Sequence, residues 1–306
     1  MYTPAQLYRG VRLGIQNPAF VGRELNRLYH RRGNRRSYNA GGVALMDEEW
    51  DTLVVLDACR YDTFAELSTL PGDLQVRESR GSHTAEFLRG NFAGRELYDT
   101  VYVTASPQLY RRREALDARF HAIDHVWDGD GWDDAAGTVR PETMTERALA
   151  ARERYPDKRL LVHYMQPHYP FLAGPDLSGR NVKTGTGVDI WGELMRGRLD
   201  VPTAEVRAGY RRNLELALPA VRDLLAATPD RAVVTADHGN MFGERARPLP
   251  VREWGHPPGV YTEELVTVPW LVRPGQRRET TADPPVEETA EAVNPADQLR
   301  SLGYVQ

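Results

Sequence analysis

Short β-rich runs that alternate with helical patterns constrain the fold of this chain more than any other feature. The runs are rich in Val, Leu and aromatic side chains, and several are apolar throughout, as expected for strands covered on both faces. They span 52–56 (TLVVL), 100–104 (TVYVT), 160–165 (LLVHYM), 231–235 (RAVVT) and 268–272 (VPWLV). Helical patterns over 142–154 and 204–227 lie between them. This alternation predicts an α/β domain with a mainly parallel central sheet flanked by helices on both faces.

The composition narrows the class of protein further. Of 306 residues, 41% are apolar, which is ample for a packed core. The 39 basic and 43 acidic residues give a net charge of -4, which argues against an overall cationic nucleic-acid binder and against wholesale disorder. Cys59 is the single cysteine, so neither a disulfide framework nor a cysteine-based zinc cluster is possible within the chain.

Charge is distributed unevenly along the chain. Residues 1–36 carry eight arginines and one acid, Glu24, for a local charge of +7, with apolar residues at nearly helical spacing. This pattern is typical of a basic amphipathic arm that leans on an anionic membrane or polyanion, or of a helix that packs on the domain with its arginines in water. We expect an arm and linker over 1–42, a main domain over 43–276, and an acidic, Pro-rich tract with a helical ending over 277–306.

The lack of long apolar stretches bears on the location of the protein. The first 20 residues lack the continuous apolar stretch of a signal peptide, and no window approaches the roughly 20 apolar residues of a spanning helix. We therefore expect a cytoplasmic protein, with peripheral contact at the inner membrane face through residues 1–36 left open.

Polar residues follow three of the predicted strands at the point where each strand ends. Asp57 follows 52–56, His168 comes just past 160–165, and Asp237 and His238 follow 231–235. Ligands of parallel α/β sheets bind outside the carboxyl ends of the strands, so these side chains should converge. Carboxylate oxygens and imidazoles suit zinc or manganese.

A hydroxyl side chain provides a candidate nucleophile. In SRGSHTAEFLRGNF, Ser82 and Thr84 precede an apparent helix that begins near Ala85. The N–H groups and dipole at a helix N-terminus favour an anionic ester group, and a divalent metal can activate a hydroxyl there. The alternative is an ordinary helix cap, a role in which Ser and Thr are common.

Four segments together resemble the alkaline phosphatase superfamily, and within it the sulfatase-like branch. They are VVLDACRYD, GSHTAEFL, HYMQPHYPF, and TADHGNMFGE followed by WGHPPGVYTEELVTVPWLV, and the resemblance covers roughly residues 50–275. It implies a catalytic domain that acts on a phosphate or sulfate ester, with glycan- or lipid-linked substrates left open.

The same resemblance implies individual roles. Asp57, Asp237 and His238 would bind the metal. Thr84 would be the metal-bound nucleophile, with Ser82 as the alternative. His168 would approach the substrate, and His256 would contact the phosphate or sulfate oxygens.

Departures from the sulfatase pattern favour phosphate chemistry. The Cys-x-Pro-x-Arg motif that carries formylglycine is absent, since Cys59 heads CRYDT, and the usual pair of aspartates is reduced to Asp57-Ala58. We expect a metal-dependent hydrolase or transferase of phosphate esters with a threonine nucleophile. A sulfuric ester hydrolase without formylglycine and a non-catalytic member that binds glycans or polyanions are the alternatives.

Other candidates are ambiguous. Arg60 could clamp an anion through two N–H groups or form a structural ion pair with Asp62 or another acid. Asp117 and His121 have the Asp-x-x-x-His spacing of a second metal site, but their run reads as an ordinary amphipathic helix. His163 lies inside a strand and reads as a core histidine. One metal site is therefore expected, and a second stays uncertain.

Overall fold

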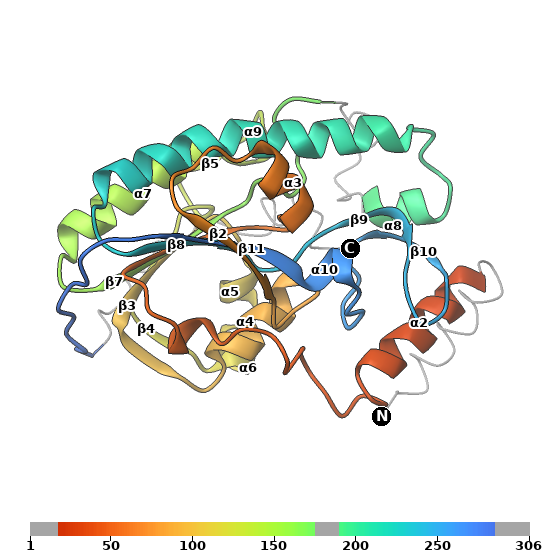
Figure 1. Cartoon of the computed structure of the whole chain (residues 1–306), viewed down its shortest axis with the longest axis horizontal. Helices are drawn as coiled ribbons and strands as arrows, with labels where there is room; N and C mark the ends of the chain where they lie inside the picture. Colours follow the sequence, from red (N-terminus) through yellow and green to blue (C-terminus); the bar gives the residue numbers. More distant parts are fainter. Residues whose placement is uncertain (1–17, 175–189, 285–306) are drawn as a thin grey trace.

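A seven-stranded sheet forms the centre of the molecule. The computed structural model describes residues 18–174 and 190–284. The strand order is β2-β11-β8-β1-β7-β3-β4 (Figure 1). These strands are β1 (Thr52–Leu56), β2 (Asp73–Glu78), β3 (Glu96–Thr104), β4 (Arg119–His125), β7 (Arg159–Tyr164), β8 (Ala232–Ala236) and β11 (Thr267–Arg273). The predicted helical ending of the chain and residues 1–17 of the basic arm lie outside the described residues.

The sheet is mainly parallel, as predicted. The neighbours from β8 through β1, β7 and β3 to β4 pair in parallel, whereas β11 runs antiparallel to both β8 and β2. All five predicted strands are present, and the two strands that the sequence pattern missed, β2 and β4, are the edges. Edge strands bury less surface, so their apolar pattern is weaker. The fold class expected from the sequence is confirmed.

Helices cover both faces of this sheet. They are α3 (Tyr61–Leu67), α4 (Thr84–Phe92), α5 (Gln108–Arg111), α6 (Arg113–Leu116), α7 (Pro141–Arg154) and α9 (Thr203–Ala227), with a 3-10 turn at Leu45–Asp47. In Figure 1, α3, α7 and α9 lie above the sheet, and α4, α5 and α6 lie below it. The helical patterns over 142–154 and 204–227 correspond to α7 and α9.

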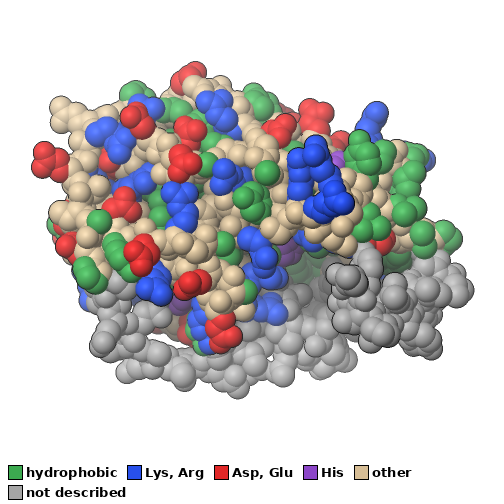
Figure 2. Space-filling model, turned by 90° about the horizontal axis from the view of Figure 1, so that it is seen from below, with side chains coloured by type: hydrophobic (Ala, Val, Ile, Leu, Met, Phe, Trp, Pro, Cys, Tyr) green, Lys and Arg blue, Asp and Glu red, His purple; other side chains and the backbone are tan. Residues whose placement is uncertain are grey.

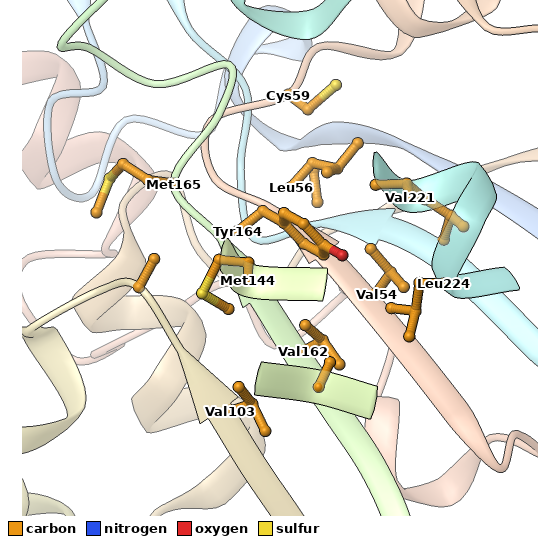
Figure 3. Packing of buried hydrophobic residues seen from close by; sticks show 14 of the residues in the cluster. Val54, Leu56, Cys59, Val103, Met144, Val162, Tyr164, Met165, Val221 and Leu224 are labelled. Carbon is orange, nitrogen blue, oxygen red and sulfur yellow. The ribbon is translucent and has the colours of Figure 1, made fainter. Parts of the chain in front are cut away.

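The side chains of β1 show how each face is buried. Successive residues of a strand point to opposite faces. Val54 and Leu56 therefore pack with Met144 of α7 and Val221 of α9 (Figure 3), whereas Leu53 and Val55 join a second cluster between the sheet and α4. Each such side chain contributes about 1.5–3 kcal/mol on burial. The central strands are thus held from both sides, which fixes the loops at their ends.

The predicted helix through Asp117 and His121 is wrong. Helix α6 ends at Leu116, the C-cap residue Asp117 adopts the left-handed conformation with φ 45°, and His121 lies on β4. The Asp117 side chain is exposed, at 73%. Within 18–174 and 190–284, this pair belongs to no group of ligand side chains that could hold a metal. Pairing with β3 overrides the helical period of the run.

Smaller elements extend one end of the molecule. Helix α2 (Pro18–His30), α8 (Ile190–Met195) and the hairpin β9 (Met241–Arg245) and β10 (Arg252–Gly255) lie at the right of Figure 1. The remaining elements are the hairpin β5 (Trp132–Asp133) and β6 (Thr138–Val139) and the short α10 (Glu263–Val266). Among the described residues, no helix has the length and apolar character needed to cross a bilayer.

The segments at the two predicted domain boundaries contact the sheet domain. Asn39 N donates to Arg80 O, and Val43 N donates to Glu78 O, so the predicted linker runs along the end of β2. After β11, the Lys158 ammonium forms an ion pair with Asp283 at 2.5 Å. The division into arm, catalytic domain and tail stays a prediction.

Candidate active site

Three neighbouring strands at the centre of the sheet deliver the predicted ligands to one place. Strand β1 lies between β7 and β8, with Leu56 in register with Tyr164 on one side and Ala236 on the other. The residue that follows each of these two strands is a predicted site residue, Asp57 after β1 and Asp237 after β8. The backbone N–H of His168 donates to Asp57 O at 3.1 Å, so the β7 loop is fixed against the β1 loop. The convergence expected from the sequence is present.

The carboxylate of Asp237 has one oxygen held by the backbone and one that is left without a partner. Oδ1 accepts from Ala58 N and His238 N, both at 2.9 Å, whereas Oδ2 is buried with no hydrogen bond. Ala58 reaches Oδ1 because it adopts a left-handed conformation with φ 60°, uncommon for a residue with a Cβ. The Tyr210 hydroxyl donates to Ala58 O at 2.8 Å and supports this turn.

Asp57 and His238 point further lone pairs at the same spot. Both Asp57 side-chain oxygens are buried without a hydrogen-bond partner. His238 Nδ1 lies 2.8 Å from Gly239 O and so carries the hydrogen, which leaves the Nε2 lone pair 3.2 Å from Asp237 Oδ2 and 3.7 Å from Asp57 Oδ1. Burial lowers the pKa of His238 to about 3, so its ring is neutral at pH 7.

These lone pairs fit a divalent cation. Burial, and then the charge of Asp237, raise the pKa of Asp57 well above its ordinary value, and burial also raises the pKa of Asp237. Unpaired buried oxygens and a facing imidazole lone pair repel one another unless a positive charge lies between them. The ligand atoms of Asp57, Asp237 and His238 lie within 4.8 Å of one another. Such mixed oxygen and nitrogen ligands suit zinc or manganese.

Thr84 lies beside this group at the first residue of α4. Its Oγ1 is 3.3 Å from His238 Nε2, and interaction with the hydroxyl lowers the pKa of both Asp57 and Asp237. The helix is capped by the side chain of the preceding residue, His83, whose Nδ1 accepts from Ala85 N at 3.1 Å. The Thr84 hydroxyl is thus not used as the cap.

The alternative hydroxyl, Ser82, is committed to structural contacts. Its Oγ lies 3.0 Å from Pro257 O and 3.1 Å from Glu86 Oε2 and accepts from Gly259 N at 2.9 Å. The hydrogen and one lone pair of the Ser82 hydroxyl are therefore occupied, whereas the Thr84 hydroxyl faces His238 Nε2.

Further histidines surround the carboxylates. The ring centroids of His83, His168 and His238 lie 5.1, 5.0 and 4.6 Å from that of His256. His168 Nε2 and His256 Nε2 are 2.9 Å apart, and His256 Nδ1 is buried with no hydrogen-bond partner. Burial lowers the pKa of His256 well below its ordinary value and that of His83 to about 3. Neutral imidazoles offer N–H donors that an anionic ester group can accept.

Arg60 has the contacts of the structural alternative that the sequence left open. Its guanidinium pairs with Asp62 at 2.5 Å and with Glu244 at 2.8 Å, and it also donates to Asn240 O at 3.1 Å. Burial alone would lower the pKa of Arg60, but the hydrogen bond and charges of these acids raise it. Since its N–H groups are occupied, Arg60 is left out of the anion site that we propose below.

A buried pair behind the carboxylates, His163 and Tyr102, escaped the sequence analysis. His163, in β7, is fully buried, with Nε2 3.6 Å from Asp57 Oδ2 and 3.9 Å from Asp237 Oδ2. Its Nδ1 lies 2.8 Å from the Tyr102 hydroxyl. If Tyr102 donates to Nδ1, the hydrogen of His163 must be on Nε2, facing the two carboxylates. The sequence did contain a signal for this position. His163 lies in a run that is otherwise mostly apolar, and it is in register with Val55 near the end of β1.

We expect Tyr102→Phe to weaken zinc binding about tenfold, because changes to the residues around a metal's ligands typically lower metal affinity by about this much or more. Without the hydroxyl, His163 can move its hydrogen to Nδ1 and turn a lone pair toward the carboxylates. Calorimetric zinc titration of the full chain measures the change. Tyr164→Phe is the matched control, since its hydroxyl contacts Thr145 Oγ1 at 2.8 Å, away from the carboxylates. Equal zinc affinity in Tyr102→Phe and the wild type would contradict this role.

The fold and the site together define an α/β protein with a candidate metal centre beside a hydroxyl on a helix N-terminus. No family model matches this chain, and no curated protein matches it. Solved structures do. One is the C-terminal periplasmic domain of EcEptC from Escherichia coli in complex with zinc, 14% identical over 74% of each chain with a TM-score of 0.46.

Two further structures show the range of these matches. The soluble domain of lipooligosaccharide phosphoethanolamine transferase A from Neisseria meningitidis is 11% identical over 72% of this chain and 75% of that one, with a TM-score of 0.47. A protein in the alkaline phosphatase superfamily from Vibrio parahaemolyticus is 12% identical over 77% and 62%, with a TM-score of 0.46. The last of these is described as a member of the superfamily that the motifs of this chain resemble. The chemistry of this chain is argued from its own residues.

The comparisons also correct one expectation. The EcEptC structures and the EptC structure from Campylobacter jejuni are described as C-terminal periplasmic domains. The predicted cytoplasmic location, at the inner membrane face or free of it, is contradicted by these findings and is not retained. Its reasoning relied on the lack of an apolar leader or spanning stretch, which says nothing about segments beyond the sequence.

Proposed function

We propose that this chain is a metal-dependent transferase or hydrolase of phosphate esters, with Thr84 as the nucleophile. One observation carries the proposal. The Thr84 hydroxyl lies at the N-terminus of α4, 3.3 Å from His238 Nε2, next to buried carboxylates whose oxygens have no hydrogen-bond partner. Asp57, Asp237 and His238 would hold the metal, with Thr84 as a further oxygen ligand. When bound, a divalent cation lowers the pKa of a hydroxyl and offsets charge on phosphate oxygens.

The residues of the chain account for the rest of the reaction. Thr84 Oγ1, once its proton has passed to water, attacks phosphorus as the bond to the leaving oxygen breaks, which gives a phosphothreonine and a leaving alcohol that takes a proton from water. Water or an acceptor alcohol then attacks that phosphorus and releases Thr84, so the group passes to water or to the acceptor. His256 would donate its Nε2–H to an equatorial oxygen, where charge develops, and His168 would lie beside it. His168 Nδ1 faces Tyr169 O and so carries the hydrogen, which makes His168 Nε2, 2.9 Å from His256 Nε2, the acceptor that an arriving anion would replace.

The proposal is tested by turnover of phosphomonoesters and phosphodiesters with added zinc or manganese. We expect activity that a chelator removes and that either metal restores. A set of sulfate esters with the same leaving groups separates phosphate chemistry from the alternative of sulfate hydrolysis. Preference for the sulfate esters would overturn the phosphate assignment. Bound metal without turnover of any ester, and without a phosphorylated enzyme, would favour the non-catalytic alternative.

A further inference from the structure

Helix α2 presents its polar side to the domain, the reverse of an ordinary amphipathic helix. Arg23 Nε donates to Glu253 Oε2 at 2.7 Å, and Glu253 is fully buried. Asn26, also fully buried, donates through Nδ2 to Leu249 O and accepts through Oδ1 from Leu249 N, both at 2.8 Å. Polar contacts of this kind have a defined geometry, so the orientation of the helix is fixed by its arginine and asparagine side chains rather than by an apolar face.

The C-terminal end of α2 is tied to the active-site helix. Arg31 forms an ion pair with Glu86 of α4, and the same carboxylate accepts from Ser82 N at 3.2 Å. Glu86 lies two residues from Thr84. Whatever binds α2 is therefore held close to the proposed nucleophile. The sequence left open a helix on the domain with its arginines in water, but here Arg23 and Arg31 make the contacts.

The apolar side of α2 consequently faces outward. Val21, Leu25 and Tyr29 recur every four residues, so they lie along one side of the helix, and they are 48%, 50% and 65% exposed. Leu249, in the turn between β9 and β10 that contacts Asn26, is 38% exposed. Only one other large hydrophobic residue of the part of the chain that the structure describes, Val76, is exposed. Most of the exposed large hydrophobic residues thus lie on α2 and on the β9–β10 turn that contacts it.

Exposed cations surround these residues. Arg32 and Arg35 follow α2 directly, and Arg245 and Arg247 belong to the β9–β10 hairpin that contacts it. Within 18–174 and 190–284, none of the four makes an ion pair with a carboxylate, whereas Glu24 and Glu253 are paired with Arg27 and Arg23. Figure 2 shows hydrophobic side chains gathered at the end of the molecule where α2 lies, beside a group of Lys and Arg side chains.

We propose that α2 and the turn at 246–250 form a docking face for a lipid bilayer with anionic headgroups. A short row of apolar side chains flanked by unpaired arginines is the pattern of a helix that lies in the interface of a bilayer. A second copy of this chain fits less well, because a twofold contact would bring the four arginines against their own copies. Docking would place a lipid-linked ester near Thr84, although the proposal does not depend on catalysis.

Flotation of the full chain with vesicles tests this proposal. We expect the protein to float with vesicles of phosphatidylcholine and phosphatidylglycerol but not with phosphatidylcholine alone. The triple variant Val21→Ser, Leu25→Ser, Tyr29→Ser should reduce the bound fraction about tenfold or more, and Arg32→Gln with Arg35→Gln should do the same. The matched control is Arg212→Gln with Arg222→Gln on α9, exposed arginines on the opposite side of the molecule in Figure 1, which should float like the wild type.

Two results would overturn the docking face. One is equal flotation of the triple variant and the wild type, with circular dichroism showing that both are folded. The other is a wild-type dimer in sedimentation that the triple variant converts to a monomer, without vesicle binding by either, which would make a second copy the occupant. Neither readout uses activity, so failure here and failure of the proposed enzymatic function are distinguishable.

Discussion

Asp57→Asn should make the metal-free protein more stable and the metal-loaded protein inactive. In the metal-free state, the amide removes a buried charge and can donate to Asp237 Oδ2, an oxygen that has no partner. We expect a gain of about 1–3 kcal/mol in the free energy of unfolding. Zinc should no longer stabilise the variant, whereas it stabilises the wild type by about 2.7 kcal/mol at a hundredfold excess over Kd. Turnover should fall on the order of a thousandfold or more.

The pH dependence of the gain provides a second readout. Burial and the charge of Asp237 raise the folded-state pKa of Asp57, so the metal-free wild type holds this proton more tightly than the unfolded chain does. Its stability therefore decreases as the pH rises above the unfolded pKa of about 4. The advantage of Asp57→Asn should grow over the same interval. Chemical unfolding of both proteins in a chelator, at about pH 4.5 and at about pH 7, measures this difference in stability.

Asp230→Asn is the matched control for this substitution. Asp230 is buried like Asp57, but its two oxygens accept from Arg152 at 2.6 Å each. Loss of that charge leaves the partly buried Arg152 guanidinium without its charged partner, so the control should destabilise the protein with and without metal. The stabilisation produced by zinc should be unchanged. If Asp57→Asn behaves like the control, its carboxylate is not a metal ligand.

The sequence could predict the centre of the site because strand ends and site residues coincide there. The strands that precede Asp57, His168 and Asp237 are buried on both faces, so their runs are mostly apolar and their ends are sharp. Parallel pairing then brings the three loops together without any further information. The start of α4 at Thr84 was predictable for a related reason, since small and hydroxyl residues precede a helix at its N-terminus.

The parts that the sequence could not predict depend on contacts between distant segments. From the sequence, Asp62 alone did not decide whether Arg60 clamps an anion or forms a structural ion pair. The second acid that pairs with Arg60, Glu244, is 184 residues away. His163 looked like a core residue since its partner Tyr102 belongs to another strand. The outward apolar face of α2 was unpredictable for the same reason, because a helical pattern shows that two faces exist but not which of them the domain contacts.

Thr84→Ala should abolish turnover, by about four orders of magnitude or more, because no other hydroxyl at this helix N-terminus can replace Oγ1 as the nucleophile. Thr84→Ser keeps an oxygen in the same place and should retain measurable activity. The decisive measurement is the position of the trapped phosphate after acid quenching during turnover, read by mass spectrometry. The wild type should carry it on Thr84 and the serine variant on the residue at the same position.

Ser82→Ala separates the nucleophile from its neighbour. The Ser82 hydroxyl bridges Pro257 O and Gly259 N, so its removal leaves buried polar groups unpaired and should cost about 1–3 kcal/mol in stability. Phosphate should still be trapped on Thr84, because nothing at that position changes. A phosphate on Ser82, or full turnover in Thr84→Ala, would transfer the nucleophile role to Ser82 or remove it from this helix. In that case the contacts of the Ser82 hydroxyl with Pro257 O and Gly259 N would have to open before each reaction.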